Sequence, residues 1–243
     1  MIILREFSSN FIKLKRTPLL LLHLLTPIVI TFLFLYYYTI AGYRIITDVR
    51  VFFIILQMSY PIFIGISVSA FTQLERNINA IQNTLGLVQS RISMYLGKIL
   101  FILFLSAINL ILYELCFYIG VNLFLDMDAF SLNLYIDIFL IFLLSNLSIY
   151  SLHLSVAFRF GSTVSVLLGI AGTILAGYFQ TAIGDKIWPI IPWEFSIRFL
   201  ENYFNFFNSP IISGIISMII LTSIILILSI LWFNRWEGRM TQE

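Results

Sequence analysis

The side chains of this chain that could do chemistry are a few serines, histidines and acids inside long apolar stretches. Ser67 follows Gly65 by two positions, and a serine nucleophile paired with a histidine base such as His153 would make an intramembrane protease. The glycine that completes a G-x-S-G-like turn is missing, since Val68 stands there. Triplets of this kind arise by chance in apolar helices. We therefore predict no catalytic residues, and an intramembrane enzyme is the less favoured alternative.

Nucleotide and metal sites are not predicted either. A phosphate-binding loop needs the pattern G-x-x-x-x-G-K-[ST], whereas the nearest stretch, Gly97-Lys98, continues with Ile99. ATP and magnesium, if they serve this protein, are therefore expected on another chain, with no cofactor bound here. His23 and His153 have no Cys, Asp or Glu at ligand spacing, so we expect hydrogen-bonded histidines rather than metal ligands.

Glu114 is the one clear acid inside an apolar segment. A charge at this depth of a membrane costs a few kcal/mol on insertion scales, so the side chain should face other helices or a wet cavity. Two interpretations stay open. Glu114 lies on a substrate path or gate, or it makes a structural hydrogen bond to a neighbour such as Asn146 or Ser148.

The composition places these residues in a membrane protein. Of the 243 residues 60% are hydrophobic and only 11% are charged, whereas soluble domains are about half apolar and a quarter charged. The net charge of +2 suggests no nucleic-acid partner, and a single cysteine, Cys116, can form no intrachain disulfide. No polar stretch is long enough for a separate soluble domain, so residues 1–243 are predicted to form one transmembrane domain.

Six apolar segments are long enough to cross about 30 Å of hydrocarbon, which predicts an all-α, polytopic fold. They cover residues 18–38, 51–71, 99–123, 134–158, 164–179 and 211–233. The fifth is short and rich in glycine. Gly169, Thr173 and Gly177 recur every four residues there, so one helix face is smooth enough for close packing within the chain or between subunits.

Basic residues predict the orientation. Six crossings put both termini on one side, where ten of the 14 Lys and Arg residues lie: Arg5, Lys13, Lys15, Arg16, Arg76, Arg91, Lys98, Arg159, Arg235 and Arg239. The other side has four: Arg44, Arg50, Lys186 and Arg198. By the positive-inside bias both termini and the 72–98 loop are predicted to be cytoplasmic.

Two segments outside the spans are unusually apolar. Residues 1–17 suggest an interfacial helix in the headgroup region, although a plain basic flank of the first span fits equally well. The outer loop 180–210 contains Trp188, Trp193 and Phe195, and we expect one or two short helices, broken by prolines, that re-enter the outer leaflet. Its charged residues are expected on a wet face: Asp185, Lys186, Glu194, Arg198 and Glu201.

The polar segment 72–98 lies between the second and third spans. From Leu74 onward apolar side chains recur at helical spacing, and polar ones occupy the opposite face. The polar face comprises Glu75, Arg76, Asn79, Gln82 and Asn83. An amphipathic helix held beside a membrane suits docking to a soluble partner, and charge reversal of Glu75 and Arg76 is expected to weaken docking without affecting folding.

This arrangement resembles the permease of a type-2 ABC exporter over essentially the whole chain. In such permeases a Glu-Arg pair opens the helix, and a P-x-S-R…G-K stretch leads into the third span. The matching residues are Glu75-Arg76, Gln89-Ser90-Arg91 and Gly97-Lys98. The usual proline before the Ser-Arg pair is absent, since Val88-Gln89 stand there, and the glycine that commonly follows the Glu-Arg pair is also missing. Gln82-Asn83, Glu6 and the basic run 13–16 are most similar to the lantibiotic-protection permeases of Gram-positive bacteria.

The resemblance implies a multi-pass subunit of the plasma membrane that pairs with a second permease and with a dimer of cytoplasmic ATPase subunits. The helix at 72–98 would be the coupling helix, with coupling residues Glu75, Arg76, Asn79, Gln82, Asn83 and Arg91. The cargo would be a lantibiotic or similar amphipathic antimicrobial peptide, with a hydrophobic drug or lipid as the alternative. Its path is expected to include Glu114, Trp188, Trp193 and Phe195.

Overall fold

The computed structural model describes residues 2–14, 17–41, 48–78, 90–125, 130–208 and 210–237. Every regular element within these ranges is helical. The α-helices are α1 (Ile2–Leu14), α2 (Pro18–Ala41), α3 (Val51–Ile78), α5 (Arg91–Leu125), α6 (Leu132–Phe160), α7 (Ser162–Phe179), α8 (Phe195–Tyr203) and α9 (Ile211–Arg235). Two 3₁₀ turns, η1 (Trp188–Ile190) and η2 (Pro192–Glu194), precede α8.

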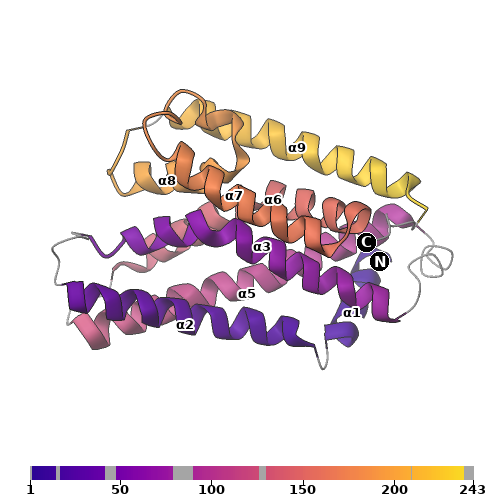
Figure 1. Ribbon diagram of the computed structural model, residues 1–243, viewed down its shortest axis with the longest axis horizontal. Helices are drawn as coiled ribbons and strands as arrows, with labels where there is room; N and C mark the ends of the chain where they lie inside the picture. Colours follow the sequence, from indigo (N-terminus) through magenta and orange to yellow (C-terminus); the bar gives the residue numbers. More distant parts are fainter. Residues whose placement is uncertain are drawn as a thin grey trace.

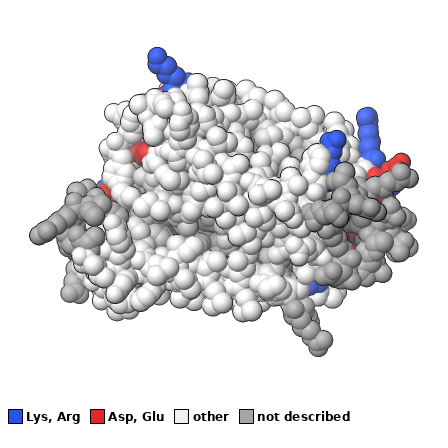
Figure 2. Space-filling model, in the orientation of Figure 1, with Lys and Arg blue, Asp and Glu red and all other residues white. Residues whose placement is uncertain are grey.

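Six of these helices are long and apolar enough to cross a membrane, which agrees with the six predicted segments. They are α2, α3, α5, α6, α7 and α9. The helices run along the long axis of the molecule, with α1 at one end and α8 at the other (Figure 1). In Figure 2 charged side chains gather toward these two ends, and the belt between them carries almost none. A multi-pass membrane protein has this distribution because its flanks face lipid.

Helices α3 and α7 pack closely against each other. A Cβ atom added at Gly169 would lie 2.5 Å from the Pro61 carbonyl oxygen, and one at Gly65 would lie 2.8 Å from the Ser165 carbonyl oxygen. Larger residues would push the two backbones apart, so the small residues of α7 serve packing within the chain at this contact. A single residue, Gly161, connects α6 to α7 at φ 100°, a conformation that favours glycine.

The first residues of the predicted amphipathic helix, 74–78, continue the helix of the second span. The second span continues without a break from Val51 to Ile78, because no glycine or proline stands between Gly65 and Ile78. The third span begins at Arg91 rather than near residue 99. Residues 79–89 of the predicted coupling helix lie outside the described residues. The 72–98 loop is therefore shorter than expected.

Helix α1 packs across the beginning of α5. Phe7 and Phe11 make edge-to-face contacts with Phe101 and Phe104, at ring-centroid distances between 5.1 and 6.1 Å. A Cβ atom added at Gly97 would lie 2.7 Å from Glu6 Cβ. The glycine thus lets α1 approach α5 closely. Whether α1 also lies in the headgroup region stays a prediction.

Gly97→Ala is expected to displace α1. The added methyl group cannot fit against Glu6 and the Phe7 backbone nitrogen 3.1 Å away, and overpacking of this kind costs about 1–3 kcal/mol. Hydrogen–deuterium exchange of the amides of α1 should speed up. Gly177→Ala is the matched control, because its Cβ would meet only Met58 Sδ at 3.6 Å. Equal exchange of α1 in both variants would contradict this packing.

Candidate functional site

A buried ionic cluster joins three helices at the predicted cytoplasmic end. Oε1 of Glu75, near the end of α3, accepts hydrogen bonds from Lys13 Nζ of α1 at 2.6 Å and from Lys98 Nζ of α5 at 2.9 Å. The side chains of Glu75 and Lys98 are each only 3% exposed, and that of Lys13 is 20% exposed. We call these three residues the Glu75 cluster.

The Glu75 cluster corrects the expectation of an exposed docking residue at position 75. The Lys98 ammonium also lies over the rings of Phe71 and Phe158, at 5.8 and 6.0 Å from their centroids, so the charges are enclosed by apolar side chains. Removing one partner of such a group leaves an uncompensated buried charge. Glu75 therefore holds the end of α3 against α1 and α5. Charge reversal at position 75 should impair folding, contrary to the expectation from the sequence.

Of the remaining predicted coupling residues, only Arg91 has a described side chain. Arg91 Nη1 donates to the carbonyl oxygen of Trp236 at 2.9 Å, so it ties the start of α5 to the segment after α9. Arg76 belongs to α3, but its side chain is not described. Asn79, Gln82 and Asn83 lie outside the described residues. The structure does not bring Arg91 into the Glu75 cluster.

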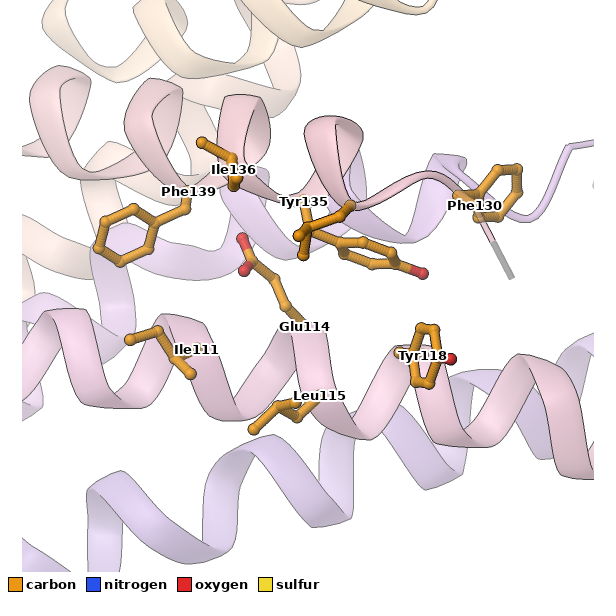
Figure 3. Close-up of a pocket in the computed structure, with 9 residues that line it drawn as sticks. Ile111, Glu114, Leu115, Tyr118, Phe130, Tyr135, Ile136 and Phe139 are labelled. Carbon is orange, nitrogen blue, oxygen red and sulfur yellow. The ribbon is translucent and has the colours of Figure 1, made fainter.

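Glu114 lines a cavity of about 670 Å³ between α5 and α6. Its carboxyl group points from α5 toward the beginning of α6, as Figure 3 shows. Four aromatic residues line the cavity: Tyr118, Phe130, Tyr135 and Phe139. Glu114 Oε1 is buried without a hydrogen-bond partner among the described residues. The expected structural hydrogen bond from Glu114 to Asn146 or Ser148 is wrong. The Asn146 amide donates instead to Gln57 Oε1, and the Ser148 hydroxyl donates to the Ser145 carbonyl oxygen.

The aromatic residues of the outer loop are not among the described residues that line this cavity. Trp188 and Phe195 are fully buried, and Trp188 packs edge-to-face on Phe199. A Cβ atom at Gly214 of α9 would lie 2.0 Å from Trp188. Trp193 is half-buried and lies against Gly172 of α7. These side chains join α8 to α7 and α9, and the structure does not bring them together with Glu114.

A second buried ionic cluster, at the end opposite α1, departs from the expected wet face. The guanidinium of Arg198 contacts Asp185 at 3.0 Å, Glu201 at 3.3 Å and Glu194 at 3.4 Å. Arg198 and Glu194 have exposed side-chain fractions of only 1% and 0%. Arg198 also donates to the carbonyl oxygens of Phe179 and Thr181. The spacing of Glu194, Arg198 and Glu201, i,i+4 and i,i+3, could have indicated this Arg198 cluster from the sequence.

The Arg198 cluster predicts a pH dependence of stability. Burial raises the pKa of Glu194 to about 8, against the opposing effect of Arg198, and the nearby Glu201 carboxylate raises it further. The folded state therefore holds a proton that the unfolded state releases near its ordinary pKa, so stability falls as pH rises between these two values. Thermal melts in detergent should give a higher melting temperature near pH 6 than near pH 8.5.

Glu194→Gln should flatten this pH dependence, because the amide stays neutral throughout. Asp137→Asn is the matched control, since that carboxylate accepts a hydrogen bond from Tyr203 in an exposed position. A Glu194→Gln variant whose melting temperature still falls with pH as steeply as that of the unchanged protein would contradict this role of Glu194.

The serine considered as a nucleophile pairs with a different histidine from the expected one. Ser67 Oγ lies 3.1 Å from His23 Nε2, while His23 Nδ1 contacts the Leu19 carbonyl oxygen at 2.8 Å. His153 instead bonds to Ser165. Both Ser67 and His23 are 1% exposed, so a substrate carbonyl cannot reach the hydroxyl in this conformation. The pair serves as a polar contact between α2 and α3.

Comparison of the chain with protein-family models, curated proteins and solved structures returns no match. Among the described residues no group of three His, Cys, Asp or Glu side chains could hold a metal ion.

Proposed function

We propose that this chain is the membrane-spanning permease subunit of an ATP-driven ABC exporter. ATP hydrolysis takes place on a separate ATPase dimer, and a second permease, identical or homologous, completes the transporter. The cargo is a lantibiotic or similar amphipathic antimicrobial peptide, which is moved out of the plasma membrane. The family assignment rests on the sequence resemblance, and both termini are cytoplasmic in this proposal.

The Glu75 cluster is the observation that best supports the mechanism. Residues 79–90 connect α3 to α5, and Glu75 and Lys98 lie close to the two ends of that connection. A displacement of the connection by an ATPase would therefore act on both helices, and through Lys13 on α1. Packed and ion-paired elements move as units rather than bending continuously. The cluster thus suits the transmission of movement from a docked partner.

The flanks of the bundle suit an apolar cargo. The belt between the charged ends is almost uncharged on the face shown in Figure 2, and the Glu114 cavity between α5 and α6 is lined mostly by apolar side chains. A peptide already dissolved in lipid needs a lateral, mostly apolar route rather than a charged pore. Hydrophobic drugs and lipids would use the same kind of route, so they are the alternative cargo.

Affinity purification from native membranes in mild detergent tests the proposal. We expect an ATP-binding ABC subunit in stoichiometric amount, with or without a second six-span permease. ATP hydrolysis by the purified complex should then increase when a cationic amphipathic peptide is added. Recovery of the chain alone, after cross-linking before solubilisation, would contradict the transporter and favour an enzyme. A bound ATPase that does not respond to any peptide would indicate a non-transporting subunit.

A further inference from the structure

The cavity between α5 and α6 combines a single acid with aromatic walls. Among the described residues that line it, Glu114 is the only one with a formal charge. Glu114 Oε1 and the Tyr135 hydroxyl are both buried without a hydrogen-bond partner among these residues. Buried polar atoms are nearly always paired, so two unpaired atoms at one cavity indicate that something else pairs with them.

The cavity is reached from the side of the bundle. Leu115 is 50% exposed and Ile136 is 48% exposed, although both line it, so its mouth opens on the flank that α5 and α6 share. In Figure 3 the Glu114 carboxyl group points between Tyr135 and Ile136, into the space between the two helices. A molecule dissolved in the lipid would meet aliphatic side chains first and the acid behind them.

The chemistry of the walls selects a cation. A carboxylate is the natural partner of an ammonium group, and a cation over aromatic faces gains further attraction that is largest where water is excluded. Tyr118 and Tyr135 meet edge-to-face, with ring centroids 6.0 Å apart, beside Glu114. The volume of about 670 Å³ suits a small molecule rather than a whole peptide.

We propose that this cavity binds a membrane-dissolved amphiphile with one cationic head, with the head at Glu114 beside the aromatic rings and the apolar tail toward the lipid. This site adds a binding step to the proposed function. It rests on that function only for the statement that the bound amphiphile is the cargo. Binding itself needs neither ATP nor a partner, so it is measured on this chain alone, and its failure leaves the ATPase test unaffected.

Protection from a carboxyl reagent measures the binding. Dicyclohexylcarbodiimide is apolar and adds to carboxyl groups in apolar surroundings. The carboxyl O–H adds across one C=N bond, and the product rearranges to a stable acylurea without losing any group. Peptide mass spectrometry of the purified chain in nanodiscs should find the label on Glu114. Dodecyltrimethylammonium, at about ten times its Kd, should slow this labelling about tenfold, since occupied sites do not react.

A variant of the aromatic wall, its matched control and a variant of the acid test how the head is bound. Tyr118→Leu keeps the wall apolar but removes one ring, and it should raise the half-protecting concentration about two- to fivefold. Tyr178→Leu is the matched control, a half-exposed tyrosine of α7 outside the cavity, and it should change nothing. Glu114→Gln should abolish labelling at this position while the chain elutes as a folded monodisperse species.

Three results would overturn the proposal. Equal protection by dodecanol would mean that any alkyl chain fills the cavity and that the cation is not recognised. Unchanged labelling at saturating dodecyltrimethylammonium would mean that no amphiphile of this class binds. Absence of the label from Glu114 in the folded protein would mean that the cavity is closed to lipid, for example by a second copy of the chain.

Discussion

Glu75→Gln should destabilise the folded chain by about 3–5 kcal/mol, because the neutral amide leaves two ammonium groups without their shared anion. Lys98 determines most of this cost, since its side chain is 3% exposed, whereas Lys13 at 20% is partly screened by solvent. Chemical denaturation in detergent, followed by tryptophan fluorescence, measures the change. Trp232 and Trp236 report from the same end of the bundle, beside Phe233.

The double variant Glu75→Gln/Lys98→Met distinguishes an uncompensated charge from a lost packing contact. It removes the buried cation together with the anion, so it should recover most of the lost stability. Asp48→Asn is the matched control, since its partner Arg50 is partly exposed and such pairs contribute about 1 kcal/mol or less. A Glu75→Gln variant as stable as Asp48→Asn would contradict the structural role of the Glu75 cluster.

Arg198→Met should have an effect of similar size at the opposite end. The change removes the only cation that contacts Asp185, Glu194 and Glu201 among the described residues. It also removes the donor to the Phe179 carbonyl oxygen at 2.7 Å. We expect a loss of about 3–5 kcal/mol, as for other buried pairs that lose one partner. The loss should shrink on acidification, because burial raises the pKa of Glu201 and this carboxylate then takes up a proton.

Lys186→Met is the control for this variant, because the lysine belongs to the same loop but is exposed, and it should change stability by less than about 0.5 kcal/mol. The stability loss of Arg198→Lys should lie between those of Arg198→Met and Lys186→Met. A lysine keeps the charge but lacks the fixed fork of donors that a guanidinium has. Equal melting curves for Arg198→Met and Lys186→Met would contradict the buried network.

The spans could be predicted from the sequence because hydrophobic length is a local property. Each predicted segment coincides with a helix that is long enough to cross a membrane. The close packing of the glycine-rich fifth span could also be predicted, and Gly169 packs against α3. Local patterns of this kind need no knowledge of which helices become neighbours.

The two ionic clusters could not be derived in this way. A polar stripe that includes Glu75 looks the same whether it faces solvent or the end of another helix, and Lys13 is 62 residues away along the chain. The clue was that Lys13, Glu75 and Lys98 all flank spans on the same predicted side. Their mutual contact depends on the packing of α1, which short-range periodicity does not specify.

The central claim is that the connection between α3 and α5 receives an ATPase, and site-specific cross-linking tests it most directly. Cys116→Ser removes the only cysteine, so Gln82→Cys then carries the single reactive thiol, and Lys186→Cys provides the control at the opposite end. In native membranes the thiol at position 82 should cross-link to an ATP-binding chain and that at position 186 should not. No cross-link from position 82, or an equal one from position 186, would contradict the account.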